Sequence, residues 1–349
     1  MRRLLFVAIA VLLSQVGSVA AQGRFPGTQW DLVEPVEQGW SPESLAEVQQ
    51  KSDQLRLTAV MVIHHGAVVA QWGDTAKPTE LASVRKSLLS ALIGRAVAEK
   101  TISLDSSLGE LGIDDNAPLL GDVEKQATVR MLLEARSGVY HPALYETPDM
   151  ARRRPPRGSH RPGTFWYYNN WDFNALGTIY EHATGTGIFE ALDQSIARSI
   201  GMQDFLPANG TYFYGPESWH RAYPIRMSAR DLARFALLYL NEGAWSGRQI
   251  VAADWVREST RPHSDVPDLP LGYGYLWWTN PRPPATGLLP EGSYFAWGAG
   301  GQYAFVIPRY DVVVVYRVDR DLRLPQPPFG DIVGLLRLTL KAGGFDGAP

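Results

Sequence analysis

The sequence predicts an α+β fold in which strands from both ends of the chain form one central antiparallel sheet. Two pairs of short segments rich in β-branched residues indicate this sheet: 57–63 with 67–72, and 302–307 with 312–318. The segments between the two pairs have the apolar spacing of helices. The simplest packing joins both hairpins in one sheet, covers it with the first and last helices, and leaves an inserted, mainly helical region.

Each element has a local signal in the sequence. The first hairpin turns through His64, His65 and Gly66, and the second turns at 308–311. Helical periodicity is found at 83–99, 128–133, 171–183, 229–240 and 331–341. An Arg- and Pro-rich stretch, residues 152–162, is predicted to be a loop because its prolines interrupt helices and strands alike.

Composition and charge exclude several classes of protein. The chain has 349 residues with 33 basic and 36 acidic side chains, which gives a formal net charge of −3. The sequence contains no Cys, so disulfides, thiolate nucleophiles and zinc–thiolate sites are excluded. Apart from the Arg-rich stretch there is no basic stripe, which argues against nucleic acid as a partner. These features are typical of a globular enzyme.

The first 21 residues have the pattern of a secretory signal peptide. Arg2 and Arg3 precede an apolar run over residues 4–13, and small residues at 18–21 provide a cleavage site. The run is shorter than the about 20 residues that a membrane-spanning helix needs. We therefore expect a periplasmic or secreted protein with no membrane span in the mature chain. An uncleaved N-terminal anchor helix is the alternative.

Ser83 and Lys86 are the first candidates for chemistry. They lie three residues apart at the start of the predicted helix 83–99, so their side chains share one helix face. A serine hydroxyl is a weak nucleophile until a base accepts its proton. A lysine amine can act as that base where an apolar setting lowers its pKa. An ordinary exposed helix lysine is the alternative interpretation of this pattern.

Two further motifs have residue types suited to catalysis or binding. Tyr168 and Asn170 lie in an aromatic run before the helix 171–183, where a phenol could transfer a proton and an amide could hold a carbonyl group. The segment 297–302 is rich in glycine and opens the second hairpin, where glycines allow a ligand to approach the backbone closely. Core packing of the aromatic run and a β-bulge at the glycines are the alternatives.

Together the three motifs resemble the serine β-lactamase and penicillin-binding protein superfamily. The resemblance is to its class C-like branch of esterases, D-amino-acid peptidases and amide hydrolases. Ser83 to Lys86 matches the SxxK motif, and Tyr168 to Asn170 matches the YxN motif. The KTG-type triplet of the lactamases and transpeptidases in that superfamily is absent from the sequence, and Trp297 to Ala299 stand in its place.

The resemblance implies a β-lactamase/transpeptidase-like domain over residues 22–349, with the sheet at about 40–80 and 270–349 and the helical part at about 100–265. It also implies that Ser83 attacks a carbonyl carbon while Lys86 and Tyr168 move the proton. The residues implied to bind or position the substrate are Asn170, Trp297, Gly298, Gly300, Gly301 and Gln302. Asn170 would also position Lys86, and backbone N–H groups of Ser83 and of a residue near Gly301 or Gln302 would stabilise the oxyanion. The resemblance implies neither a metal nor another cofactor.

The expected protein is an exported serine hydrolase that cleaves small esters or amides through an acyl-enzyme on Ser83. A D-amino-acid or cell-wall peptidase, or a β-lactamase, would use the same mechanism on another substrate. A non-catalytic penicillin-binding-like protein is the alternative from a different class. Because the third motif lacks the cation and hydroxyl that hold a carboxylate, we expect esters to be preferred over β-lactams.

Two other features bear on the substrate. An aromatic cleft is predicted from Trp166, Trp171, Trp219, Trp277, Trp278 and Trp297, with about half of these six residues serving only as packing. The Arg-rich stretch directly precedes the Tyr168 motif, so one of its arginines could hold an anionic substrate group. A solvated loop is the alternative interpretation of that stretch.

Overall fold

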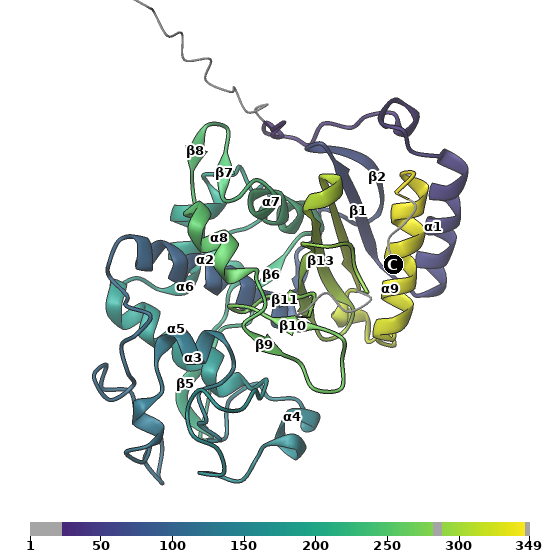
Figure 1. Ribbon diagram of the computed structural model, residues 1–349. Coiled ribbons are helices and arrows are strands. Elements are labelled where there is room, and N and C mark those ends of the chain that lie inside the picture. Colours follow the sequence, from purple (N-terminus) through teal and green to yellow (C-terminus); the bar gives the residue numbers. More distant parts are fainter. Residues whose placement is uncertain (1–22, 282–287, 346–349) are drawn as a thin grey trace, which may run out of the picture.

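The computed structural model describes residues 23–281 and 288–345, so the predicted signal peptide lies outside the described residues. A large antiparallel sheet occupies one side of the molecule and most of the helices occupy the other (Figure 1). The strand order β2-β1-β14-β13-β12-β11-β10-β9 places the N-terminal hairpin beside the C-terminal one. The predicted α+β fold, with strands from both ends in one sheet, is confirmed.

The sheet contains β1 (Ala59–His64), β2 (Ala67–Gly73), β9 (Ser264–Asp265), β10 (Gly272–Tyr273), β11 (Trp278–Thr279), β12 (Tyr294–Gly298), β13 (Gln302–Ile307) and β14 (Val312–Arg317). Three further pairs of short strands are β3 (Thr79–Glu80) with β6 (Arg226–Met227), β4 (Phe213–Gly215) with β5 (Ser218–Ala222), and β7 (Ala244–Trp245) with β8 (Arg248–Gln249).

The α-helices are α1 (Pro42–Gln54), α2 (Arg85–Ala98), α3 (Val129–Leu133), α4 (Pro148–Arg153), α5 (Asn170–Thr184), α6 (Ile188–Leu192), α7 (Ala229–Leu240), α8 (Ala253–Ser259) and α9 (Phe329–Ala342). The five predicted helices and both predicted hairpins begin and end within two residues of their observed bounds. Within the described residues, no helix has the length and apolar character needed to cross a membrane.

The central strands are buried on both faces of the sheet. β1 pairs antiparallel with β14, with Ala59 opposite Arg317 and His64 opposite Val312. Every residue of β1, β13 and β14 is buried, because helices cover both faces. Strands buried on both faces have continuous apolar runs rather than alternating patterns. This explains the unbroken run of valines at the start of β14.

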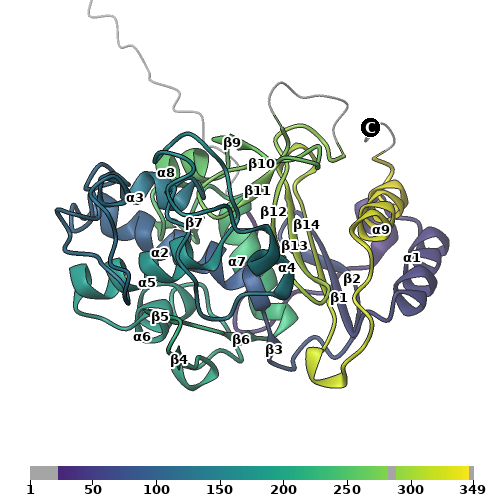
Figure 2. The same cartoon turned by 90° about the horizontal axis from the view of Figure 1, so that it is seen from below.

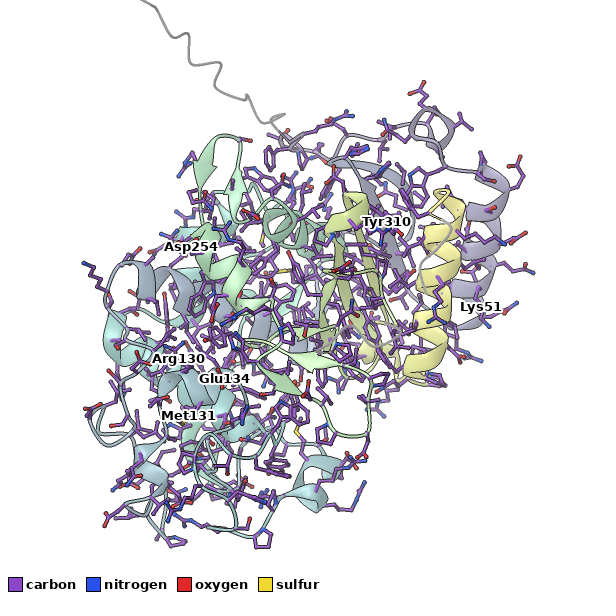
Figure 3. All side chains as sticks on the ribbon, in the orientation of Figure 1. Lys51, Arg130, Met131, Glu134, Asp254 and Tyr310 are labelled. Carbon is purple, nitrogen blue, oxygen red and sulfur yellow. The ribbon has the colours of Figure 1, made fainter. Side chains whose placement is uncertain are left out.

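Helices α1 and α9 pack together on one face of the sheet (Figure 2). The Trp72 indole in β2 donates a 2.7 Å hydrogen bond to Ser52 of α1, and the Tyr316 hydroxyl lies 2.7 Å from that of Thr339 of α9. Lys51 lies on the side of α1 that faces away from the sheet (Figure 3). Helix α1 was not predicted, although its Ser-Pro start is a typical helix N-terminus.

The opposite face is covered by α7, which packs against β1, β13 and β14. The expectation that the helix at 83–99 covers the sheet is therefore wrong. That helix, α2, packs against α5, α6 and α8 in the helical region, and the 3₁₀ turn before it, Ala82–Val84, contacts β12 and β13. Because α2 is buried around most of its circumference, it needs neighbours on several sides.

The Arg-rich stretch is not entirely a loop as predicted. Its first two arginines end α4, which begins after the Thr147 N-cap and stops before Pro155. Asp149 forms ion pairs with Arg152 and Arg153, three and four residues further along this helix. These pairs support one helical turn before the prolines interrupt it.

Candidate active site

Ser83 lies in a tight turn between β3 and α2. It belongs to the 3₁₀ turn Ala82–Val84, and the residue before it, Ala82, has a φ of +47°. A residue with a Cβ rarely adopts this left-handed conformation, which costs on the order of 1–3 kcal/mol and persists only where surrounding packing enforces it. Ala82 and Val84 are buried, whereas Ser83 is partly exposed. The turn therefore presents the Ser83 hydroxyl at the surface.

Lys86 connects the hydroxyl groups of Ser83 and Tyr168. Its Nζ lies 2.7 Å from Ser83 Oγ and 2.7 Å from Tyr168 Oη. The side chain is only 1% exposed, and Nζ lies 4.7 Å from the centre of the Phe173 ring. Burial, together with the positive charge of Arg85, lowers the pKa of Lys86 well below that of an ordinary lysine. A lysine with such a pKa is able to accept a proton.

Tyr168 reaches this position because a cap fixes the chain just before α5. The side chain of Asn169 accepts a hydrogen bond from the backbone N–H of Asp172 at 2.9 Å, which starts the helix. Burial raises the pKa of Tyr168 to about 12, so its phenol is protonated near neutral pH. Ser83, Lys86 and Tyr168 thus form one chain of hydrogen-bonding groups.

Within the described residues, the Asn170 amide forms no hydrogen bond to Lys86, contrary to the positioning role that the resemblance implied. Its Nδ2 donates to the backbone oxygen of Tyr145. Its Oδ1 is buried and has no hydrogen-bond partner within the described residues. A buried amide oxygen without a hydrogen-bond partner is energetically costly.

The third motif reaches the nucleophile through Gly298. A Cβ at this position would lie 2.4 Å from the carbonyl oxygen of Leu81 and 3.1 Å from the backbone N of Ser83. Only glycine therefore lets β12 approach the turn that holds Ser83. Gly300 and Gly301, with φ of +81° and +87°, form the turn that follows β12.

Gln302 was expected to bind substrate, but its side chain is not free to do so. Its side chain is fully buried at the start of β13, where Nε2 donates to the backbone oxygens of Gly300 and Val318. Its Oε1 accepts a 2.6 Å hydrogen bond from Arg317. The amide is thus occupied in joining the turn after β12 to β14, which leaves it no means of contacting a substrate.

Three of the six tryptophans considered above form a connected aromatic group with Tyr168. The ring of Tyr168 lies 5.3 Å from that of Trp278, which lies 4.9 Å from Trp297 and 6.2 Å from Trp166. Trp297 also stacks on Phe329 at 4.6 Å. Of the other three tryptophans, Trp171 and Trp277 are fully buried, and Trp219 is 64% exposed on β5.

Four of the five arginines of the 152–162 stretch form ion pairs with acidic neighbours. Arg154 pairs with Glu146, and Arg157 pairs with Glu124 at 2.7 Å. Together with the pairs that Asp149 forms, these contacts neutralise most of the positive charge of the stretch locally. Sequence reasoning also overlooked Arg85, which is buried beside Lys86 inside the SxxK motif itself.

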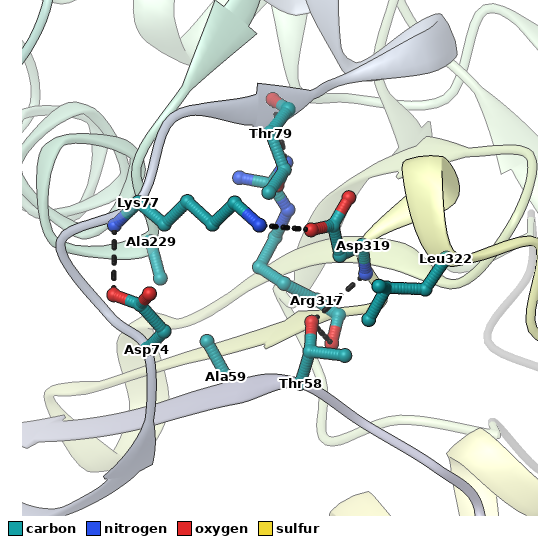
Figure 4. Close-up of a pocket in the computed structure, with 9 residues that line it drawn as sticks. All are labelled: Thr58, Ala59, Asp74, Lys77, Thr79, Ala229, Arg317, Asp319 and Leu322. Atoms are coloured by element: carbon teal, nitrogen blue, oxygen red, sulfur yellow. Dashed lines mark hydrogen bonds and ion pairs between the residues drawn. The ribbon is translucent and has the colours of Figure 1, made fainter.

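A separate cavity of about 240 Å³ lies where β1 begins and β14 ends, near the start of α7 (Figure 4). Its cationic groups have partners: Lys77 Nζ lies 2.8 Å from Asp319, and Arg317 donates to the neutral Thr79 Oγ1 at 2.7 Å. The backbone N–H of Lys77 donates to Asp74 at 3.1 Å. In residues 23–281 and 288–345, no cluster of three or more His, Asp or Glu side chains is arranged to hold a metal ion.

Comparison with known proteins finds relatives over most of the chain. A family model described as Beta-lactamase matches residues 43–331. An uncharacterized protein of Alkalihalophilus pseudofirmus is 22% identical over 292 residues, which span 74% of this chain and 82% of that protein.

Two solved structures are similar in fold. A putative 6-aminohexanoate-dimer hydrolase from Bacillus anthracis has a TM-score of 0.66 and 21% identity, over 92% of this chain and 87% of that one. A β-lactamase from Mycobacterium bovis has a TM-score of 0.59 and 20% identity, over 85% of this chain and 99% of that one.

Proposed function

The chain belongs to the beta-lactamase family, and from that premise we propose that it is a serine hydrolase cleaving small esters or amides through an acyl-enzyme on Ser83. The observation that carries the proposal is the position of the Lys86 amine, 2.7 Å from both Ser83 Oγ and Tyr168 Oη. A serine becomes a nucleophile when a positioned base accepts its proton. Burial of Lys86 supports this role, because it disfavours the ammonium form.

In the first half of the reaction, Ser83 Oγ forms a bond to the substrate carbonyl carbon while its proton moves to Lys86. The carbonyl electron pair moves onto oxygen, where backbone N–H groups stabilise the charge. Ser83 supplies one such group from its 3₁₀ turn. We place the second at the end of β12 beside Gly298, rather than near Gly301 or Gln302 as expected, because Gly298 closely approaches the backbone N of Ser83. Donors of this kind contribute roughly 3–4 kcal/mol each in the transition state.

The tetrahedral intermediate then expels its leaving group. The C–O or C–N bond breaks, and the leaving atom takes a proton that Lys86 and Tyr168 deliver. Water next attacks the acyl-enzyme, the same pair accepts its proton, and Ser83 Oγ leaves with a proton as the acid product departs. Both halves use the same two groups in opposite directions, so the cycle is balanced without another reactant.

The surroundings of Ser83 favour neutral or apolar substrates. Trp297 takes the place of the cation that would hold a carboxylate, and it stacks on Phe329 and contacts the Trp278 ring at a tilted angle. Aromatic faces contribute large apolar contact areas but no charge to pair with an anion. These contacts support esters with apolar groups over β-lactams and D-Ala-D-Ala peptides.

We further propose that the protein is exported and acts in the periplasm or outside the cell, on the basis of the N-terminal sequence pattern. Expression of the full chain, cell fractionation and mass measurement test this directly. The expected product is extracytoplasmic and begins at residue 22. Cytoplasmic accumulation of an uncleaved chain would contradict export.

The activity is tested by labelling with a fluorescent fluorophosphonate and by a hydrolysis screen. The screen compares p-nitrophenyl esters, D-peptides, linear amides and a chromogenic cephalosporin. We expect covalent labelling and ester hydrolysis, both dependent on Ser83. A cell-wall peptidase would instead prefer D-peptides, and a non-catalytic penicillin-binding-like protein would give no turnover of any substrate.

A further inference from the structure

Arg85 is a buried cation without an acidic partner in the described part of the chain. It lies between Ser83 and Lys86 in the chain and is 1% exposed. Its Nη1 donates a 3.0 Å hydrogen bond to the carbonyl oxygen of Ala82. Its Nε and Nη2 are buried and have no hydrogen-bond partner within the part of the chain that the structure describes. No carboxylate among the described residues forms an ion pair with it. Such burial is costly for a charged group.

Two tyrosine rings hold this guanidinium. Its central carbon lies 5.3 Å from the centre of the Tyr145 ring and 5.0 Å from that of Tyr223. Cation–π contacts of this kind compensate part of the cost of removing the charge from water. They also fix the position of the guanidinium group, because the two rings belong to different segments of the helical region.

Arg317 and Arg234, the other arginines that are fully buried among the described residues, are satisfied more completely. Arg317 donates to the backbone oxygen of Met227, to Thr79 and to the amide of Gln302. Arg234 donates to the backbone oxygens of Ile200 and Gly27. Both therefore tie separate segments together through hydrogen bonds, which is a structural role. Arg85 makes one hydrogen bond, and it goes to the residue directly before the nucleophile.

We propose that Arg85 is a positioning residue of the reaction. It holds the turn that presents Ser83, and its positive charge disfavours protonation of the neighbouring Lys86 amine. The proposal rests on the proposed function of Ser83 and Lys86. Its first part follows from the hydrogen bond to Ala82, whose left-handed φ of +47° needs an external constraint. Its second part follows from the placement of two cations on consecutive residues of one buried helix turn.

The other titratable groups around Lys86 are neutral near pH 7. Burial raises the pKa of Tyr168 to about 12 and holds that of Tyr273, which packs against Tyr168, well above 10. Asp172, on the first turn of α5, has a pKa raised by burial to about 8 and is mainly protonated. The charge of Arg85 is therefore not cancelled by these neighbours, and together with burial it lowers the pKa of Lys86.

The test measures the titration of Lys86 itself. The six lysines are labelled with ¹³C at the ε carbon, and the NMR shift of Lys86 is followed against pH in the full mature chain. The Lys86 signal is assigned by its loss in Lys86→Arg. The variants are Arg85→Met, which removes the charge and the hydrogen bond, Arg85→Gln, which keeps a donor, and Arg85→Lys, which keeps the charge. Arg95→Gln on the same helix is the matched control.

We expect the Lys86 midpoint to rise by at least about half a pH unit in R85M and R85Q, and to stay near the wild-type value in R85K and R95Q. An unchanged midpoint in either charge-removing variant that folds would overturn the electrostatic part. Arg85→Met is an apolar replacement for a poorly paired buried charge, a kind of substitution that proteins often tolerate, so it remains informative if R85Q unfolds.

Whether Arg85 holds the Ser83 turn is tested by the rate of fluorophosphonate labelling. The rate is measured at its high-pH plateau, where Lys86 is neutral in every variant. We expect R85M to be at least about tenfold slower than R85Q, because only R85M lacks a donor to the Ala82 carbonyl. Equal plateau rates in R85M and R85Q would overturn this part. Absence of labelling in the wild type would instead contradict the proposed function, while the NMR titration would still decide the electrostatic part.

Discussion

The amine of Lys86 lies 2.7 Å from the hydroxyl oxygen of Ser83, one helical turn away. Residues three apart on a helix face the same side, so the sequence spacing alone brings the two side chains together. The protein adds burial to this proximity, since Lys86 is enclosed whereas Ser83 remains partly exposed. The base is thus shielded from water while the nucleophile stays accessible.

The first prediction is that Ser83→Ala abolishes both fluorophosphonate labelling and ester hydrolysis without unfolding the protein. The substitution removes one partly exposed hydroxyl and leaves the turn and α2 unchanged. Intact-mass measurement after labelling checks the loss, and circular dichroism checks the fold. Persistent labelling at another serine would refute the assignment of the nucleophile.

The second prediction is that Lys86→Arg lowers kcat/KM for a p-nitrophenyl ester by at least about a hundredfold, although it keeps the positive charge. Guanidinium stays protonated at any working pH, so it cannot accept the Ser83 proton. It is also larger, and the 2.7 Å spacings to Ser83 and Tyr168 leave no room for it. Wild-type turnover in K86R would show that lysine is not the base.

The third prediction concerns the close approach of β12. Gly298→Ala places a methyl group 2.4 Å from the Leu81 carbonyl oxygen and 3.1 Å from the backbone N of Ser83, so the strand must shift away from the nucleophile. We expect kcat to fall at least about tenfold, because the donors of the oxyanion site move apart. Gly334→Ala on α9 is the control: its Cβ meets nothing within 4 Å, and activity should be unchanged. Equal activity of both variants would contradict the placement of β12.

Motif spacing and periodicity predicted the central sheet, five helices and the meeting of Ser83 with Lys86, because these depend on local patterns. The locations of Gln302 and Arg85 depend on tertiary packing, which no local pattern encodes. The Gln302 amide is polar and adjacent to glycines, yet Arg317, from the neighbouring strand, binds it in the interior. Arg85 has the sequence appearance of a solvent-exposed helix residue and is instead enclosed by Tyr145 and Tyr223.

The fourth prediction concerns the pH dependence of stability. Burial raises the pKa of Asp172 to about 8 in the folded protein, whereas the pKa of an aspartate in the unfolded chain is about 3.9. The folded state therefore binds this proton more tightly, and the resulting stabilisation is complete below about pH 4 and is lost as the pH rises towards 8. Asp172→Asn keeps an acceptor for the Ser137 hydroxyl but does not titrate.

We therefore expect the Tm of D172N minus that of the wild type to increase steadily between pH 4 and pH 8 and to level off only above pH 8. Thermal unfolding of both proteins across this range measures the difference directly. Their other titratable groups are shared, so the subtraction removes those contributions. A difference that is constant with pH would show that Asp172 does not hold its proton in the folded state.

The last prediction concerns substrate choice, and it depends on the absence of a free cation in the third motif. Trp297 contributes an indole, Gly298 contributes no side chain, and the Gln302 amide is bound by Arg317 and two backbone oxygens. The arginines best placed by sequence to compensate are held by acids, Arg154 by Glu146 and Arg157 by Glu124.

A β-lactam presents a carboxylate near its reacting carbonyl, and burying that charge without a partner is costly. An ester has no such group, and its leaving alcohol needs less help from a proton donor than an amine does. We expect kcat/KM for a chromogenic cephalosporin to be at least about a hundredfold below that for a short-chain p-nitrophenyl ester, equivalent to about 2.7 kcal/mol. Comparable efficiencies would refute the preference. In that case, selective loss of cephalosporin turnover in Arg154→Ala or Arg157→Ala would identify the cation that holds the carboxylate.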